Sequence, residues 1–235
     1  MYWLDDNMKL SKLTIGCHQK NWKWGNFMTD LEKRITRMED LQEIQQLLNR
    51  YVYMLVTMDF DHIYEECFSQ TRPDVSIQAS DSGVYIGGEH IKERFFGKFM
   101  GFIKTVPGAF TMHLTCNPVI EISEDGTKAR SVAPSPGCAT DPQNREALWI
   151  WGTFMDDYIK EDGKWKILHH AFVPLFRTPY DKGWTNLAVG TQLSKVSGKM
   201  ADGPSQFWNP YGMDKKGDEL WATVPTVEEL KHMDF

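Results

Sequence analysis

The 235-residue sequence predicts an α+β fold, with helices first and an antiparallel sheet after them. Two observations predict this class. Apolar residues recur at helical spacing over about residues 36–68, and strand-like alternation dominates from about residue 110 to residue 172. Helices followed by a meander of strands are typical of α+β proteins and differ from the repeated βαβ pattern of a Rossmann fold.

Three helices are expected. Thr36-x-x-Glu39 fits a capping box, so the first helix should begin at Thr36. Its second half is apolar nearly all round, which indicates that it enters an enclosed interior. Asp59-Phe60-Asp61 breaks this helix, and a short second helix should follow over residues 61–68. A third helix is expected over residues 89–103.

The strands are separated by clear turn signals. Pro134 to Asn144 contains three prolines and one glycine and is expected to be a loop, and Glu161-Asp162-Gly163 predicts a tight hairpin. The expected strands cover residues 75–77, 84–86, 110–114, 119–122, 129–133, 147–160 and 164–172.

Composition excludes several classes of function. The formal net charge is −6, and no run of five like charges occurs, so a nucleic acid is not expected as a main partner. No stretch of 18 apolar residues and no apolar N-terminal segment occur, which argues against a membrane span and a secretory signal. We therefore expect a cytoplasmic protein without a membrane partner.

Aromatic residues are frequent in both flanks of the predicted domain. Of the nine tryptophans, six lie outside the helical and strand-like core. Residues 1–35 are expected to be an N-terminal extension, residues 36–177 the domain, and residues 178–235 a C-terminal arm. Because the arm has many aromatics but weak periodicity, we expect it to pack on the domain or on a neighbouring subunit of a homo-oligomer.

Three motifs follow one another along the chain. Asn49-Arg50-Tyr51 precedes Asp59-Phe60-Asp61 by eight residues, the segment from Thr111 to Ile120 contains a histidine, and Gly152-Thr153-Phe154 is followed by the segment from Tyr158 to Ile167. In this order they resemble SnoaL-like proteins of the nuclear-transport-factor-two-like superfamily. The first motif is similar to the first helix of that family, the second to its histidine strand and the third to its closing hairpin.

The resemblance implies a curved, mostly antiparallel sheet folded around helices into a cone, with a deep pocket at the wide end. It also implies a tendency to form dimers or trimers. The superfamily includes polyketide cyclases, scytalone and bile-acid dehydratases, isomerases, dioxygenase small subunits and non-catalytic binders, so the fold leaves the function open.

Three residues are the candidate catalytic groups. His113 matches the pocket histidine of dehydratase-like members, and could act as a general acid or base, or only hold the bulge at Asn117. Tyr51 matches a pocket tyrosine and could polarise a substrate oxygen, or be a core aromatic. His170 shares a strand face with Phe172 and is expected to face inward, unless it and His169 both cap the strand end.

The sequence departs from the family at the expected carboxylate. Dehydratases of this superfamily carry a carboxylate five residues after the position of Tyr51, where this chain has Val56. On a later strand, positions that are polar in those dehydratases are occupied by Gly152 and Phe154 in this chain. Asp156 and Asp157 lie toward the hairpin end, where a solvated carboxylate is expected.

The remaining candidates describe an apolar cavity. Its expected substrate-binding residues are Leu55, Val56, Ile150, Phe154 and Phe172. No cofactor motif occurs, and a third ligand to join His113 and His170 in a metal site is not evident, so neither a cofactor nor a metal is expected.

The leading hypothesis is a cofactor-independent lyase or isomerase, of the dehydratase or cyclase type, that transfers protons on a hydrophobic cyclic small molecule. The first alternative is a non-catalytic small-molecule-binding or scaffold protein that has lost the carboxylate of the family. A second alternative is an assembly subunit of an oxidoreductase complex.

Overall fold

The computed structural model describes residues 20–185 and 199–232, with side chains from residue 29 onward. The described residues divide into two units, with the boundary between Met38 and Glu39. The first helix, α1 (Lys20–Val56), crosses the boundary between them, and the second unit contains all the described strands. The α+β class and the curved, mostly antiparallel sheet are confirmed.

The expected start of the first helix is wrong. Thr36 is an interior residue of α1, which begins at Lys20. Residues 29–39 are rich in Leu, Glu, Lys, Arg and Met and contain neither Gly nor Pro, so nothing in them interrupts a helix. The Thr36-x-x-Glu39 pattern therefore lies inside a helix and caps nothing.

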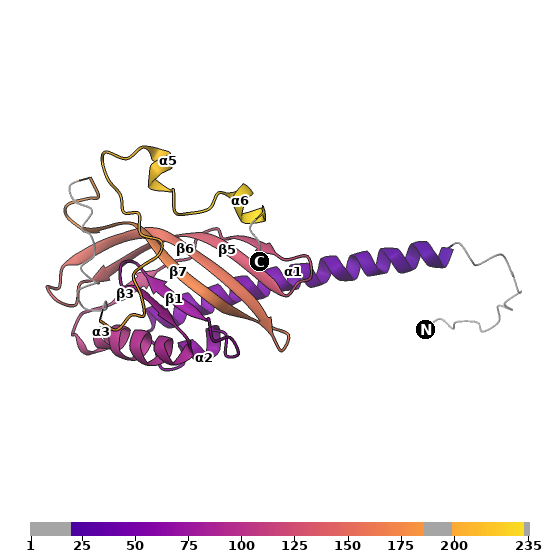
Figure 1. The fold of residues 1–235 in the computed structure, drawn as a ribbon, viewed down its shortest axis with the longest axis horizontal. Coiled ribbons are helices and arrows are strands. Elements are labelled where there is room, and N and C mark those ends of the chain that lie inside the picture. Colours follow the sequence, from indigo (N-terminus) through magenta and orange to yellow (C-terminus); the bar gives the residue numbers. More distant parts are fainter. Residues whose placement is uncertain (1–19, 186–198, 233–235) are drawn as a thin grey trace, which may run out of the picture. The chain divides into compact units, whose positions relative to one another are not determined.

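The other two helical segments form close to their expected positions. The short helix is α2 (Ile63–Cys67), and the third segment is a π-helix, η1 (His90–Met100), that continues into α3 (Gly101–Thr105). Figure 1 shows α2 and α3 on the side of the sheet away from α5 (Gly217–Leu220) and α6 (Val227–His232). Within the described ranges, no helix is both long and apolar enough to cross a membrane.

One seven-stranded sheet contains every described strand. Its path runs β2 (Val84–Ile86), β1 (Ser76–Ala79), β7 (Lys164–Pro179), β6 (Ala147–Glu161), β5 (Lys128–Thr140) and β3 (Thr111–His113), and β4 (Val119–Ile122) also pairs with β5. The β1–β7 pairing is parallel and the others are antiparallel.

The expected loop over residues 134–144 is wrong in its first half, because β5 continues to Thr140. The carbonyl groups of Pro134 and Pro136 accept hydrogen bonds from the amides of Cys116 and Leu114, on the β3 side. In an antiparallel ladder the N–H of a residue points to the same side as its carbonyl, so the missing proline donors face the short edge strand and not β6. The pairing of β5 with β6 is therefore unbroken.

The last two strands form the longest hairpin of the sheet. Asp162 and Gly163 both have positive φ (49° and 77°), which confirms the predicted tight turn. β7 extends beyond its expected end at Phe172 to Pro179, and two register irregularities interrupt its pairing with β6. Such bulges increase local twist and curve the hairpin over the helices.

Small side chains on the inner face of β5 make room for large side chains from neighbouring elements. Every second residue of β5 faces inward and is small: Ala129, Ser131, Ala133, Ser135, Gly137 and Ala139. The neighbouring strands and α1 supply large buried aromatics opposite this strip, among them Tyr51, Phe154 and Tyr158.

The described part of the C-terminal arm packs on its own domain. Val84 and Gly203 form a bridge, the Asp202 carboxylate accepts from the Ile86 amide at 2.8 Å, and Leu230 is fully buried. Figure 1 shows this segment, in yellow, running across the sheet. Residues 186–198 and 233–235 lie outside the described ranges. The expectation that the arm also reaches a neighbouring subunit stays a prediction.

Asp40 joins α1 to the closing hairpin and gives a test of the fold. Its carboxylate is buried and accepts hydrogen bonds from the Trp165 indole at 2.8 Å and from the Lys160 ammonium at 2.5 Å. Asp40→Ala leaves a buried indole N–H without an acceptor and a partly buried cation without its anion. We expect a loss of about 2–3 kcal/mol in the free energy of unfolding, measured by urea denaturation.

Glu43→Ala is the matched control, because Glu43 is an exposed acidic residue one turn further along α1. It should change stability by less than about 0.5 kcal/mol. Equal effects of the two substitutions would contradict the role given to Asp40.

Candidate functional site

Three buried polar side chains form a hydrogen-bonded chain between α1 and the hairpin. Asp156 on β6 lies directly opposite His170 on β7, and its Oδ1 is 2.6 Å from Nδ1 of His170. Nε2 of the same imidazole is 3.1 Å from the hydroxyl of Tyr51 on α1. Each of the three residues is at most 3% exposed.

The Asp156 carboxylate determines which ring nitrogen of His170 carries the hydrogen. An ionised carboxylate only accepts hydrogen bonds, so Nδ1 of His170 carries a hydrogen and donates it to Asp156. In the neutral imidazole, Nε2 is then the acceptor for the hydroxyl of Tyr51. Burial, followed by the negative charge of Asp156, raises the pKa of Tyr51 well above its usual value, so Tyr51 stays a neutral phenol.

Aromatic rings surround this chain. The ring of Tyr51 lies 4.5 Å from the ring of His170, between centroids, and the Phe154 ring lies 5.0 Å from that imidazole. Such a setting excludes water and strengthens the interaction between the imidazole and the carboxylate.

His113 occupies a different wall and is held by β5. Its Nδ1 lies 3.4 Å from the hydroxyl of Ser135, and its ring contacts Phe172 edge-on at 4.4 Å between centroids. Gly137 makes this position possible, because a Cβ there would approach the His113 Nδ1 to 2.8 Å. Burial, and then the positive charge of Arg177, lower the pKa of His113 to about 3, so its imidazole is neutral near pH 7.

One cavity of about 270 Å³ joins these groups. Of the residues predicted from the sequence, seven line it: Tyr51, Leu55, His113, Ile150, Phe154, His170 and Phe172. Val56 does not, since its half-buried side chain packs against the core in the last turn of α1.

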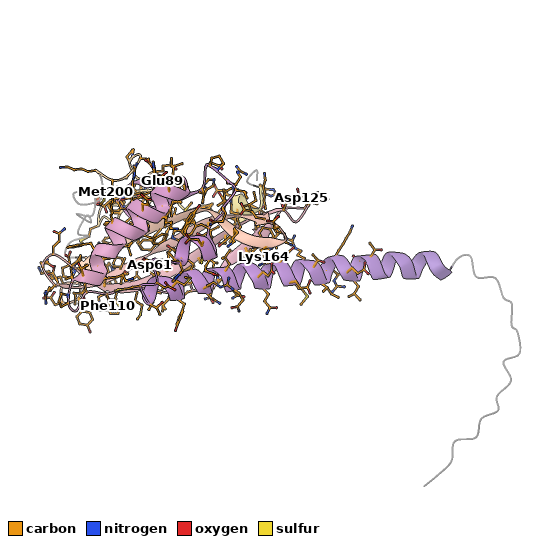
Figure 2. All side chains as sticks on the ribbon, turned by 90° about the horizontal axis from the view of Figure 1, so that it is seen from below. Asp61, Glu89, Phe110, Asp125, Lys164 and Met200 are labelled. Atoms are coloured by element: carbon orange, nitrogen blue, oxygen red, sulfur yellow. The ribbon has the colours of Figure 1, made fainter. Side chains whose placement is uncertain are left out.

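The cavity reaches the surface at the β5–β6 turn, away from the β4–β5 and β6–β7 turns. Gln143 and Asn144 of the β5–β6 turn, and Phe110, are exposed residues that line the cavity at this end. Figure 2 shows Phe110 at one end of the domain and Asp125 and Lys164, which mark the other turns, at the opposite end. Arg177 and Asp141 also lie at the open end, with Nη2 of Arg177 4.0 Å from Oδ2 of Asp141.

Among the residues that sequence reasoning missed, two charged side chains matter for the chemistry of the site, Asp156 and Arg177. Asp156 was expected to be solvated, and it is 2% exposed, so that expectation is wrong. Its distance of two residues from Phe154 was the available signal, because strand alternation puts both on the inner face. Arg177 was missed because β7 was expected to end at Phe172.

Metal-ligating side chains do not gather elsewhere in the part of the chain that the structure describes. No group of three or more His, Cys, Asp or Glu residues there could hold a metal ion. The expectation of a site that works without a cofactor stays a prediction.

The sequence belongs to the SnoaL-like family, because the model of the SnoaL-like domain matches residues 36–171. Comparison with curated proteins finds no match to this chain.

Solved structures share the fold at low sequence identity. A candidate scytalone dehydratase from Novosphingobium aromaticivorans is similar with a TM-score of 0.53 and 17% identity, over 63% of this chain and 91% of the other. For a nuclear-transport-factor-2-like superfamily protein from Salmonella enterica, the TM-score is 0.52 and the identity 21%, over 63% of this chain and 99% of the other. For a hexachlorocyclohexane dehydrochlorinase, LinA type 2, the TM-score is 0.52 and the identity 16%, over 64% of this chain and 92% of the other.

The lowered pKa of His113 makes stability depend on pH. Between pH 6.5 and about 3 the unfolded chain binds a proton at this imidazole and the folded protein does not, so stability falls as the pH falls. His113→Asn removes this contribution. The loss of unfolding free energy between pH 7 and pH 4.5 should be smaller in the variant by about 2 kcal/mol.

Urea denaturation at the two pH values measures this difference whatever the absolute stability of the variant. His62→Asn is the control, because His62 is exposed and its pKa is raised by Asp59. A pH dependence that is the same in the wild type and in His113→Asn would show that the pKa of this imidazole is not lowered by folding.

Proposed function

We propose that this protein is a cofactor-independent lyase or isomerase that transfers a proton on a hydrophobic cyclic small molecule. The observation that carries the proposal is the buried Asp156–His170–Tyr51 chain at the wall of a mostly apolar cavity. A base oriented by a carboxylate, beside a neutral hydroxyl donor, is the equipment that proton abstraction next to a carbonyl requires.

The proposed step begins when a substrate carbonyl oxygen replaces His170 as the acceptor for the Tyr51 hydroxyl. Nε2 of His170 then takes a proton from the carbon next to that carbonyl, and the C–H electron pair moves into the enolate. The enolate oxygen is stabilised by the Tyr51 O–H, and the imidazolium by the Asp156 carboxylate.

The proton on His170 can leave in two ways. In an isomerase, Nε2 returns it to another carbon of the conjugated enolate. In a lyase, the enolate expels a leaving group from the β-carbon, and the imidazolium protonates that group. Both routes restore the neutral imidazole and need no external oxidant or reductant.

His170 suits the role of base better than His113, which the sequence favoured. An effective general base has a pKa near the working pH, and the pKa of His113 is lowered to about 3 without a carboxylate to stabilise its charged form. We assign His113 the role of a neutral hydrogen-bonding group on the opposite wall, beside the bound molecule.

The shape and chemistry of the cavity support a cyclic, hydrophobic substrate. Leu55, Ile150, Phe154 and Phe172 line it together with Phe95 and Phe99, and many of its polar lining residues lie at the β5–β6 turn. Apolar and aromatic walls favour fused or aromatic rings over sugars and nucleotides.

A second candidate is a binding protein without catalytic activity. Two observations favour it: Val56 stands where dehydratases of the family carry their carboxylate, and Tyr51 and His170 already satisfy each other. Native mass spectrometry of the purified protein would detect a retained ligand in either case.

The enzyme proposal is tested by deuterium incorporation into bicyclic ketones. We expect the protein in D₂O to accelerate exchange of the α-protons of at least one of 2-tetralone, 1-indanone and 1-decalone, followed by mass spectrometry. His170→Gln should reduce the accelerated rate by roughly 10²–10⁴-fold, as expected for the loss of a positioned general base.

Two further variants separate the roles. In Asp156→Asn, the side-chain amide can donate a hydrogen bond to Nδ1 of His170. This moves the ring hydrogen to Nε2 and removes the base, so the exchange rate should fall about as far as in His170→Gln. His169→Gln is the control, because His169 lies on the other face of β7, bonded to Ser76. Ketone binding without accelerated exchange would favour the binding protein.

A further inference from the structure

Arg177 is a buried cation without a hydrogen-bond partner among the described residues. It lies near the end of β7, its side chain is 10% exposed, and it lines the same cavity as His113 and Tyr51. Within that part of the chain its guanidinium donates no hydrogen bond, and the nearest acid, Asp141, is 4.0 Å away. A contact at that distance is an ion pair but not a hydrogen bond.

This state is energetically unusual for an arginine. A guanidinium has five N–H donors and cannot lose its charge near neutral pH, so it cannot adapt to burial by deprotonation. Buried charges in proteins are paired and hydrogen-bonded because desolvation is costly. Burial lowers the pKa of Arg177, although Asp141 and Asp81 act in the opposite direction. The donors of Arg177 are therefore available to an acceptor in the cavity.

Sheet register places Arg177 in one row with His113. Arg177 is paired with Ile150, Ile150 with Gly137, and Gly137 with His113. Gly137 has no side chain, so only Ile150 stands between the guanidinium and the imidazole along this row. A group bound to Arg177 would thus lie toward the neutral His113 ring, which can donate or accept a hydrogen bond.

The same register separates Arg177 from the proposed proton-transfer chain. Asp156 lies six residues along β6 from Ile150, which corresponds to about 20 Å along an extended strand. Curvature of the sheet and the length of the arginine side chain shorten this separation. A ligand that reaches both ends of the cavity must still be elongated.

We propose that Arg177 is an anion-binding group at the open end of the cavity and that the ligand is an elongated, hydrophobic cyclic carboxylate. The position of its rings rests on the proposed function, with the reacting carbonyl at Tyr51. A planar guanidinium holds a carboxylate with two parallel hydrogen bonds. The nearby negative charge of Asp141 favours a singly charged carboxylate over a doubly charged phosphate.

Asp141 makes the proposal sharply testable. Its Oδ1 accepts a hydrogen bond from the Gln143 amide, and its Oδ2 faces Arg177. If Arg177 binds a carboxylate, Asp141 competes with that ligand, and removal of its charge should strengthen binding. If Arg177 and Asp141 only hold the β5–β6 turn, Asp141→Asn should leave ligand affinity unchanged.

The experiment compares two probes of nearly equal shape, 4-(1-naphthyl)butanoic acid and its primary amide, by isothermal titration calorimetry at pH 7.5. For the wild type we expect the acid to bind at least 10-fold more tightly than the amide, as a charge-assisted pair implies. Arg177→Gln should reduce the ratio of the affinity for the acid to the affinity for the amide to about one. Arg177→Lys should retain part of this ratio. Asp141→Asn should tighten binding of the acid several-fold and leave the amide unchanged.

Arg130→Gln is the matched control. Arg130 lies on the outer face of β5, where its Nε donates to Asp157 at 2.6 Å, so the same change of charge there should leave the ratio intact. Circular dichroism melts of each variant establish that it is folded before titration. Wild-type protein that binds the acid no better than the amide, or not at all below 1 mM, overturns the proposal, as does a ratio that persists in Arg177→Gln.

The failure of this proposal can be distinguished from the failure of the proposed function. His170→Gln should slow the accelerated deuterium exchange, as predicted above, and preserve the preference for the acid. Conversely, a protein that prefers the acid but exchanges no ketone protons would be a carboxylate-binding member of the family.

Discussion

A buried carboxylate on β6 determines the chemistry of the whole interior. Asp156 has little water around it and is stabilised by the Nδ1 hydrogen of His170, directly across the strand pair. This bond fixes the tautomer and the orientation of the imidazole, and thereby turns Nε2 toward α1 and the hydroxyl of Tyr51. Replacing Asp156 by an apolar residue would free the ring and remove the stabilisation of its charged form.

The fold serves to bring these three side chains together. α1 supplies Tyr51 from one side, and the curved hairpin supplies the cross-strand pair from the other. Gly137 on the inner face of β5 lets His113 approach that strand closely, and Ala139 on the same face lines the cavity. The position of His113 therefore depends on a small residue in the neighbouring strand.

The two ends of the cavity hold different charged groups. At the inner end, the Asp156 carboxylate compensates for any positive charge that develops on His170. At the open end, Arg177 is a permanent cation, with Asp141 4.0 Å away and Glu146 also in the lining, and its charge helps to keep His113 neutral. In the arrangement that we propose, Arg177 orients an elongated, acidic ligand by its carboxylate.

By itself, the sequence determined the α+β class, the family and the tight turn at Asp162-Gly163, because each depends on local spacing. It favoured an inward His170, and the structure decided this by burying that side chain. The bond between Asp156 and His170 depends on the register of β6 against β7, which no local pattern specifies. The start of α1 was also not specified by the capping pattern at Thr36, because the residues before it continue the helix. The continuation of β5 through Pro134 and Pro136 depended on the neighbouring strand, which decides whether the missing backbone N–H donors of the two prolines interrupt the pairing. The role of Arg177 likewise became apparent only when β7 was seen to continue past Phe172, because burial of a charge is a property of the assembled sheet and its cavity.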